Sequence, residues 1–300
     1  MARVNADAWV PEEYGSEVLT RVMRNSAIEA TARRYAMQSD VINVPRIGAA
    51  TTQVTAKGGA YVDDNPTLDE VTLTARKFTN AITIAEEDLE DALANIVSAH
   101  QAEWAVSYAT HLDNAALGAT GAENGGTVPF TSVYKSAPAG NKIATAGAVT
   151  YSDLSDVFGL VEAGAYWNDA DAVVIAHPKF KSVFRGILDT NNRPIFVEGL
   201  NGTPSTLFGY AVNFSYGAIV SATASSAPGG AGGVAGTAGN PLLVVGNRQH
   251  LLLGVRNGPE SVLSYEVGAR TDEPLLKMRA RRAFAVGRAE AFGILEVTTA

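Results

Sequence analysis

AEEDLEDALANIVSAHQAEWAVSYATHLDNAAL, residues 85–117, is the stretch that decides the fold expected for this chain. Its apolar residues recur at spacings of three and four, which places them on one stripe of a helix. No Pro or Gly interrupts the pattern before Gly118. At about 1.5 Å per residue the helix is expected to be about 48 Å long, enough to span a flat molecule. The stripe consists of Leu89, Leu93, Ile96, Val97, Trp104, Ala105, Tyr108, Leu112 and Ala116.

The start of this helix carries both a cap and a cluster of acids. Thr83 and Glu86 have the spacing of a capping box, in which each side chain satisfies a free N–H group of the first turn. The sequence EEDLED (86–91) puts five carboxylates near the N-terminal end, where the helix dipole favours negative charge. The dipole and exposure to solvent explain these acids better than a pair of catalytic carboxylates does.

Residues 41–84, before the helix, predict a long two-stranded excursion. The apolar VINVPRI (41–47) is followed by a stretch rich in Thr, Gly, Asp and Asn. In EVTLTARKFTNAITI (70–84), apolar and polar residues then alternate with the period of a strand. An isolated hairpin of this kind is only marginally stable in water, and its tip has little to bury within its own subunit. It is therefore either a mobile surface loop or an arm that another subunit completes.

The rest of the chain mixes helical and strand patterns. Residues 1–40 predict an arm with an amphipathic helix, in which Arg21 and Arg24 lie on a different face from the apolar residues. Residues 221–240 have low complexity and predict a flexible surface loop. The fold class is therefore α+β, with interleaved units. The other expected segments are a loop (118–150), a helix capped by Ser152 or Asp153 (151–167), a buried strand (170–178), a helix (178–190) and β segments (206–215, 241–255, 261–267 and 275–297).

Composition limits the classes of function. The chain has 300 residues, enough for two structural units, and its 46% hydrophobic content excludes a disordered protein. Only 18% of the residues are charged, which favours a subunit that packs against copies of itself. The net charge of −8 argues against broad phosphate binding, and the four arginines within 21–34 are too few to favour nucleic acid. The chain has no Cys, and no segment has the apolar run of a membrane span or a signal peptide, so we expect a cytosolic product.

No residue pattern predicts catalysis, a cofactor or a metal ion. His100 and His111 share a helix face, but they are about 16 Å apart along its axis and too distant to hold one metal. His177 and Asp189 leave open a two-domain hydrolase, although a turn is the stronger interpretation of Asp189. The glycine-rich residues 230–235 imitate a dinucleotide-binding fingerprint without the strand and helix that such a site requires.

Five segments, taken in order, resemble the major capsid proteins of tailed bacteriophages, which have the Hong Kong 97-type fold. Each motif is weak alone, but their order over about 280 residues makes the match specific. The segments are VPEEYGSEVLTRVMRNSAIEATA (10–32), ITIAEEDLEDA (82–92), AVVIAHPKFKSVFRGILDTNNRPIF (172–196), LFGYAVNFS (207–215) and MRARRAFAVGRAEAFGILEV (278–297).

The resemblance implies both an architecture and a function. The chain is expected to be a structural protein and not an enzyme, with copies forming the pentamers and hexamers of an icosahedral shell that encloses a genome. Shells would assemble in the host cytoplasm. The implied parts are an N-terminal arm (1–43), an extended hairpin or E-loop (44–80), a peripheral (P) domain with a spine helix and a sheet (81–120 and 260–285) and an α/β axial (A) domain (121–259 and 286–300).

The resemblance also implies partners and interface residues. The hairpin is expected to lie over a neighbouring subunit, with Lys57, Tyr61 and Val62 as interface candidates, and the arm adds Arg21 and Arg24. Further partners are a separate scaffolding protein, a portal and a decoration protein, with packaged DNA in weak contact and no membrane. An encapsulin-type shell of a cellular nanocompartment keeps the same fold and is the alternative function.

Covalent crosslinking is a property of some members of the family and is not expected here. Those members join subunits by an isopeptide bond between an E-loop Lys and an Asn, with a catalytic Glu. Lys57 matches the Lys, but the acceptor and catalyst positions fall at Glu273 and Ala280. Neither residue can supply the chemistry that its position requires.

Overall fold

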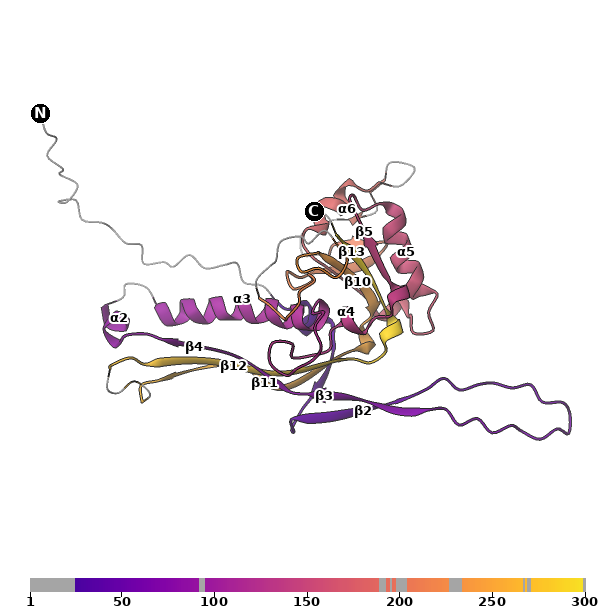
Figure 1. Ribbon diagram of the computed structural model, residues 1–300, viewed down its shortest axis with the longest axis horizontal. Helices are drawn as coiled ribbons and strands as arrows, with labels where there is room; N and C mark the ends of the chain where they lie inside the picture. Colours follow the sequence, from indigo (N-terminus) through magenta and orange to yellow (C-terminus); the bar gives the residue numbers. More distant parts are fainter. Residues whose placement is uncertain are drawn as a thin grey trace, which may run out of the picture.

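The computed structural model describes residues 25–91, 95–188, 193–194, 196–197, 204–226, 234–266, 268 and 271–298 of the chain. An elongated part, built on a long sheet and the helix α3, meets a compact part near the end of α3 (Figure 1). The hairpin β2–β3 projects from this junction beneath the compact part. Helices and sheets thus occur together, which confirms the α+β class predicted from the sequence.

The helix predicted over 85–117 is wrong in one respect, because the structure has two helices there. These are α2 (Glu86–Asp91) and α3 (Ile96–Leu117). Asn95 caps α3 with extended backbone angles, and its side chain accepts a hydrogen bond from the backbone N–H of Ser98 at 3.0 Å. An Asn side chain competes with the helix for backbone donors in this way, and it therefore starts helices readily.

The predicted capping box is also wrong. Thr83 is the last residue of the strand β4 (Arg76–Thr83), where it pairs with Leu275. Glu86 is already the first residue of α2, and its backbone N–H donates to the carbonyl of Asp272. The strand therefore continues to Thr83, and the turn before α2 is held by a distant segment of the chain.

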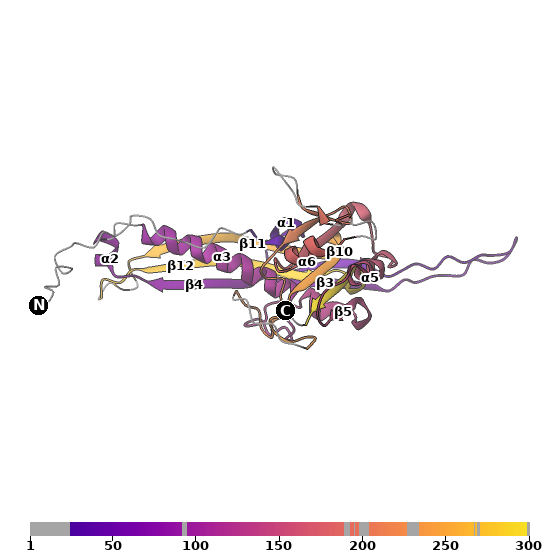
Figure 2. The same cartoon turned by 90° about the horizontal axis from the view of Figure 1, so that it is seen from above.

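The predicted helical stripe does face a sheet. Four strands lie in the order β1 (Arg33–Ala36), β11 (Leu251–Ser264), β12 (Leu275–Val286) and β4. Helix α3 runs along one face of this sheet (Figure 2). Trp104, Tyr108 and Leu112 are buried in one apolar core with the β12 residues Leu276 and Met278. Leu93, which belongs to the predicted stripe, lies outside the described residues.

The hairpin is shorter than predicted. Strands β2 (Val41–Ile47) and β3 (Leu68–Thr74) pair in antiparallel register, but β4 leaves the hairpin and joins β12 instead. The chain turns at Ala75, whose N–H donates to the carbonyl of Asp40. The strand alternation seen in residues 70–84 therefore belongs to two strands in different sheets, and periodicity alone does not reveal the turn between them.

The compact part is built on a seven-stranded sheet in the order β5-β13-β10-β6-β9-β8-β7. Helix α5 (Tyr151–Glu162) packs against β13 and β10, and α6 (Phe180–Gly186) adds Phe180 and Phe184 to the same core. The strands are β5 (Lys142–Thr145), β6 (Ala172–Ala176), β7 (Phe196–Val197), β8 (Thr206–Leu207), β9 (Tyr210–Phe214), β10 (Leu242–Asn247) and β13 (Phe292–Val297).

Two further expectations for the compact part are wrong. The predicted loop 118–150 contains the helix α4 (Val133–Ser136) and the strand β5. The cap of α5 is Thr150, whereas Asp153 occupies the third helical position and completes a capping box with it. Single turns of 3₁₀ helix complete the described structure at Ala139–Asn141, Asp169–Asp171, Arg248–His250 and Ala289–Ala291.

Candidate functional site

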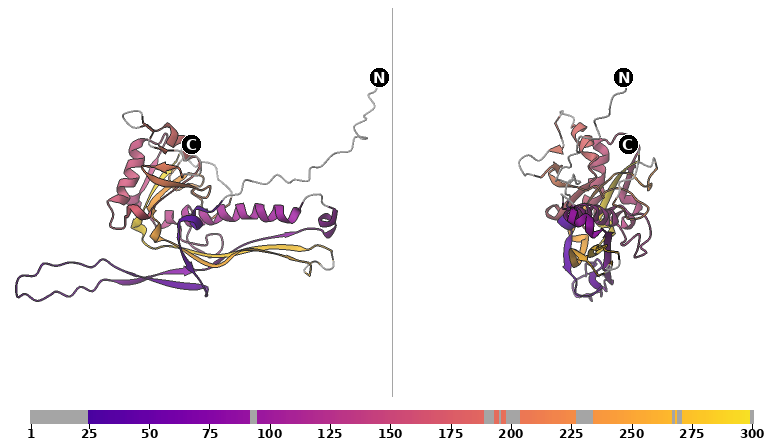
Figure 3. Two further views of the ribbon diagram at one scale, coloured as in Figure 1. Left: turned by 180° about the vertical axis from the view of Figure 1, so that it is seen from behind. Right: turned by 90° about the vertical axis from the view of Figure 1, so that its left-hand side faces the viewer.

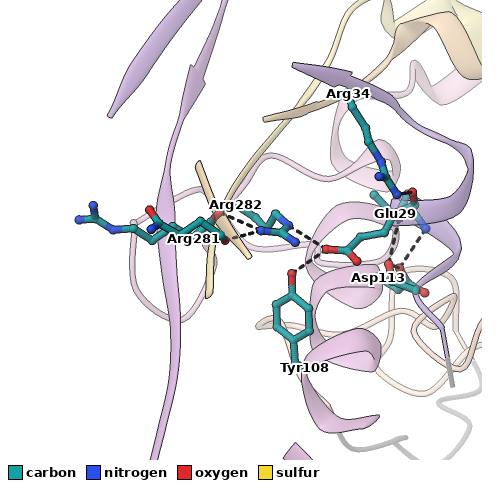
Figure 4. Close-up of polar contacts among 9 residues, drawn as sticks. Glu29, Arg34, Tyr108, Asp113, Arg281 and Arg282 are labelled. Carbon is teal, nitrogen blue, oxygen red and sulfur yellow. Dashed lines mark hydrogen bonds and ion pairs between the residues drawn. The ribbon is translucent and has the colours of Figure 1, made fainter. Parts of the chain in front are cut away.

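The end of the N-terminal arm is anchored to the long helix by one buried carboxylate. Helix α1 (Ala27–Thr31) begins beside Asp113 of α3, which is only 1% exposed. The backbone N–H groups of Ala27 and Ile28 donate to this carboxylate at 2.8 and 3.1 Å. The hydroxyl groups of Ser26 and Ser215 also donate to it, the latter at 2.5 Å. Asp113 thus joins the arm, the long helix and the loop after β9, and Figure 4 shows it beside α1.

Burial and hydrogen bonding act in opposite directions on Asp113. Burial raises the pKa of its carboxyl group, because the charged form loses its hydration. The four donors stabilise the charged form and so oppose that change. Each donor is also a buried polar group that would be unsatisfied without the carboxylate, and the anchor therefore depends on the complete set.

A second anchor joins α1 to the sheet through Glu29. The hydroxyl of Tyr108 and the Nε of Arg282 both donate to Oε1 of Glu29, at 2.8 and 2.7 Å (Figure 4). Arg282 lies on β12 and is only 5% exposed, and its Nη1 also donates to the carbonyl of Asn257. Burial and the neighbouring Glu29 carboxylate raise the pKa of Tyr108, so it remains a donor.

The hairpin presents its side chains to solvent. Beyond the paired strands, Val54 is fully exposed, Tyr61 is 93% exposed and Val62 is 61% exposed. Lys57 is exposed in the turn at the tip. The structure therefore brings the candidates Lys57, Tyr61 and Val62 onto one unsupported element. The other two candidates, Arg21 and Arg24, lie outside the described residues.

The positions required for crosslinking carry no reactive groups suited to it. Ala280 is fully buried in β12, where its methyl group contacts the core under α3. Glu273 is exposed and accepts a hydrogen bond from the hydroxyl of Thr271. Lys57 is thus the one member of the expected set that this chain carries.

The side chains of His177 and His111 form a capping hydrogen bond and an aromatic packing contact, respectively. His177 is 4% exposed, and its Nδ1 accepts from the N–H of Lys179, so the ring caps the turn before α6. His111 packs edge-on against Phe78, and burial lowers its pKa. Asp189, the proposed partner of His177 in a hydrolase, lies outside the described residues. Among the residues that the structure does describe, no three His, Cys, Asp or Glu side chains are grouped to hold a metal ion.

Sequence reasoning missed the two anchors. A weak signal exists for each of them. Asp113 is a carboxylate beside the apolar stripe residue Leu112, and Ser26 and Glu29 have the spacing of a cap. Neither signal identifies its partner, because the contacts from the arm to α3 and β12 join residues that are far apart in the sequence.

Comparison with known proteins places nearly the whole chain in one family. The model of the phage capsid family matches residues 7–297. The chain belongs to the phage capsid family. No curated protein matches the sequence.

Solved structures similar to this capsid protein share its fold over their full length. A chain from Microbacterium phage Oxtober96 has a TM-score of 0.72 and 19% identity, with 100% of this chain and 99% of that chain covered. A chain from Mycobacterium phage Bobi has a TM-score of 0.73 and 18% identity, with 100% of this chain and 98% of that chain covered. A chain from the capsid of a native GTA particle has a TM-score of 0.71 and 17% identity, with 99% of this chain and 100% of that chain covered. The Hong Kong 97-type capsid fold implied by the sequence is therefore confirmed.

Family membership makes this capsid protein a structural component of the virion. The described residues contain no helix that is both long and apolar enough to cross a membrane. The two anchors and the exposed hairpin are thus elements of a shell subunit, and they are interpreted as such below.

Proposed function

We propose that this protein is the major shell subunit of a tailed double-stranded DNA phage, and that its copies form five- and six-membered rings that enclose the genome. The observation that carries the proposal is the hairpin. Its tip exposes Val54, Tyr61 and Val62 with no core of its own, and a hairpin of this kind needs a partner for stability. Membership of the phage capsid family makes a second copy the natural partner. The similar GTA capsid is described with C5 symmetry, which supports five-membered rings.

The domains and further partners belong to the same proposal. The strand pairing favours an arm that ends near residue 40, an E-loop over 41–75, and a P domain that includes β4, α2, α3, β11 and β12. The seven-stranded sheet and its helices then form the A domain. Assembly takes place in the host cytoplasm with a separate scaffolding protein and a portal, and a decoration protein can be added. The net charge of −8 keeps contact with the packaged DNA weak.

Electron microscopy of the purified protein, together with one deletion, tests this function. The protein should form closed shells, and removal of residues 52–66 should abolish them without changing the cooperative melt of the isolated subunit, because every deleted residue except the half-buried Pro66 is exposed. Loss of the cooperative melt would show that the hairpin tip belongs to the subunit core. Small shells with protein cargo and no DNA would favour the encapsulin alternative, and a stable monomer would exclude both.

A further inference from the structure

A polar pocket lies where the strand β4, the helix α3 and the segment after α3 meet. Its volume is about 360 Å³. Its wall includes residues 76–80 of β4, Ser107 and His111 of α3, and Gly125 and Gly126 of the following segment. In Figures 1 and 3 the end of α3 lies beneath the compact part, so the pocket is close to the junction of the two parts. This volume accommodates a small ion together with water molecules.

One guanidinium group supplies positive charge to the pocket. Phe78 of β4 is buried under α3, and strand alternation places Arg76 and Asn80 on the same side of the strand. Arg76 thus lies on the side of β4 that faces α3, and it lines the pocket. No Asp or Glu is among the described residues that line it. The pocket is therefore suited to an anion and not to a cation.

The guanidinium group of Arg76 is only partly satisfied. Its Nη2 donates to Oε1 of Glu123 at 2.8 Å, and the side chains of this pair are 31% and 37% exposed. Its Nε is buried and has no hydrogen-bond partner in the described part of the chain. A buried N–H group without a partner is rare, because it has lost water without gaining an acceptor. Arg76 therefore has capacity for a second acceptor besides Glu123.

The segment beside this guanidinium group depends on glycine. Gly125 has a φ angle of +72°, in the left-handed region that favours glycine. A Cβ atom there would lie 2.9 Å from Nη1 of Arg76, so a side chain would displace the guanidinium group. The side chain of Asn124 accepts from the N–H groups of Gly126 and Val128 at 2.9 and 3.0 Å and fixes the turn. The backbone thus forms a preformed wall beside Arg76.

Neutral donors surround the rest of the pocket. Ser107 carries a hydroxyl group, Asn80 an amide and His111 an imidazole. Burial lowers the pKa of His111, so its ring is neutral at neutral pH and one of its nitrogens carries a proton to donate. Because β4 is an edge strand of its sheet, alternate backbone N–H groups of residues 76–80 point away from β12. An anion in the pocket therefore meets donors from both a helix and a strand.

We propose that this pocket binds one tetrahedral oxyanion of the phosphate class, held by Arg76 of β4 and His111 of α3. A small rotation of the guanidinium group turns Nε towards the ion. A tetrahedral oxyanion accepts hydrogen bonds in several directions, which suits donors from two elements, and charge-assisted bonds to it are strong. Its source is either free inorganic phosphate or the phosphodiester of a nucleic acid. The bound ion joins β4 to α3 and so stabilises the folded subunit.

Calorimetric titration of the full-length protein with inorganic phosphate, at neutral pH and constant ionic strength, tests the site. We expect one phosphate ion per subunit. Arg76→Leu should weaken binding at least about tenfold, because it removes the charged donor. Arg248→Leu is the matched control, because Arg248 also pairs with one carboxylate, that of Asp171 at 2.9 Å, and lies outside the pocket. This control should bind phosphate like the original protein.

The variant Glu123→Gln decides the question even if Arg76→Leu fails to fold. It removes the counter-charge of Arg76 from an exposed position, so phosphate should bind at least about threefold more tightly. Melting curves at matched ionic strength should show that phosphate raises the melting temperature more than chloride does, both in this variant and in the original protein. Unchanged or weaker phosphate binding by Glu123→Gln would mean that Arg76 serves Glu123 alone, which overturns the proposal.

Competition identifies the class and the source of the ion. Acetate should bind at least about tenfold more weakly than phosphate, because a planar carboxylate accepts from fewer directions. Equal affinity for acetate contradicts the phosphate class. Displacement of bound phosphate by oligothymidylate identifies a nucleic-acid phosphodiester as the source, and phosphate binding without displacement identifies the free ion. Both of these outcomes support the pocket, whereas absence of saturable phosphate binding, or equal binding by a folded Arg76→Leu variant, overturns it.

Discussion

Two buried polar residues, Asp113 and His177, differ in how their hydrogen-bonding groups are satisfied. Asp113 accepts four hydrogen bonds and has no capacity left over. His177 uses Nδ1 to cap the turn before α6, but its Nε2 is buried with no hydrogen-bond partner in the described part of the chain. Because Nδ1 accepts a hydrogen bond, the neutral ring carries its proton on Nε2, and a second proton would have to bind Nδ1 against the N–H of Lys179. A charged ring would also be buried without a counter-charge, so His177 should make the subunit sensitive to acid.

The stability of the subunit is expected to fall between pH 6.5 and pH 4 because of His177. Burial and the positive charge of Lys179 lower the pKa of His177 to about 4. The unfolded chain binds a proton near its ordinary pKa of about 6.5, whereas the folded chain does not. The stability is therefore complete above pH 6.5, and about 3 kcal/mol of it is lost as the pH falls to 4.

The variant His177→Asn isolates this effect. Its Oδ1 can accept the N–H of Lys179 as Nδ1 does, and an amide does not titrate. Urea unfolding at several pH values should show a smaller loss of stability in the variant than in the original protein. Identical loss in both would contradict the assignment, because the other carboxyl and imidazole groups are common to the two proteins.

Trp104 is expected to be the most costly truncation on α3. Its ring stacks on Tyr108 with centroids 5.4 Å apart and is 8% exposed above the sheet. Trp104→Ala should destabilise the unassembled subunit by about 3 to 5 kcal/mol. Glu90→Ala, on the exposed side of α2, should cost well under about 1 kcal/mol. An unchanged melt of Trp104→Ala would mean that the aromatic face of α3 is not part of the core.

At the scale of helices and strands, the periodicity of apolar residues predicted the elements whose burial depends on their own sequence. The apolar stripe predicted the buried face of α3, alternation predicted β12, and a short apolar run predicted the core strand β6. The end of α2 before Asn95 and the turn at Ala75 were missed, because a single side-chain cap or backbone bond decides each of them. The strand β5 was missed because it has four residues and depends on β13 for its pairing.

In the candidate site too, features set by the local sequence could be predicted, and features set by contacts between distant segments could not. The exposure of Tyr61 and Val62 could be predicted, because a two-stranded excursion has no inner face to bury them. The anchors at Asp113 and Glu29 could not, because they depend on contacts between residues that are far apart in the sequence. The grouping of cations on the side of the four-stranded sheet away from α3 appears only when register sets Lys77 beside Arg281.

The attachment of α1 to the sheet is expected to depend on the buried pair Glu29–Arg282. Glu29→Gln should cost about 3 kcal/mol, because it leaves the guanidinium of Arg282 buried without a counter-charge. Glu260→Gln is the matched control in the same sheet. Its partner Arg279 has a side chain that is 55% exposed, so the change should cost less than about 1 kcal/mol.

A double-mutant cycle separates the pair from its surroundings. Arg282→Met removes the buried charge, and the double variant Glu29→Gln/Arg282→Met should be more stable than the sum of the two single effects predicts. Additive effects would show that Glu29 acts through Tyr108 alone and that the ion pair does not hold α1 in place.

At the scale of the whole molecule, shells of this protein are expected to be held together without covalent bonds. Ala280 has no carboxylate and Glu273 no amide, so Lys57 lacks both the acceptor and the catalyst for an isopeptide bond. Mature shells should dissociate in hot denaturing detergent into monomers of 31.3 kDa. A ladder of larger species on a gel would refute this, and Lys57→Arg would then show whether that lysine forms the bond.

The path of the chain between the two sheets has a consequence for biosynthesis. Strands β10 and β11 are joined by one short turn and β12 and β13 by another, so two neighbouring strands of one sheet continue as two neighbouring strands of the other. β13 lies between β5 and β10, and among the described strands it is the one that β5 pairs with. On the ribosome, the seven-stranded sheet therefore stays incomplete until β13 has been translated, long after the hairpin has emerged. A chain that stops after Gly287 also lacks Phe292 and Ile294, which belong to the same core as the buried residues of α3. Added protease should therefore degrade both parts of this chain rapidly, whereas rapid degradation confined to the seven-stranded sheet would show that the elongated part folds first. The subunit can therefore finish folding only when nearly all of this sequence has been translated. Until then the hairpin is exposed on the ribosome with no folded copy beside it to bind.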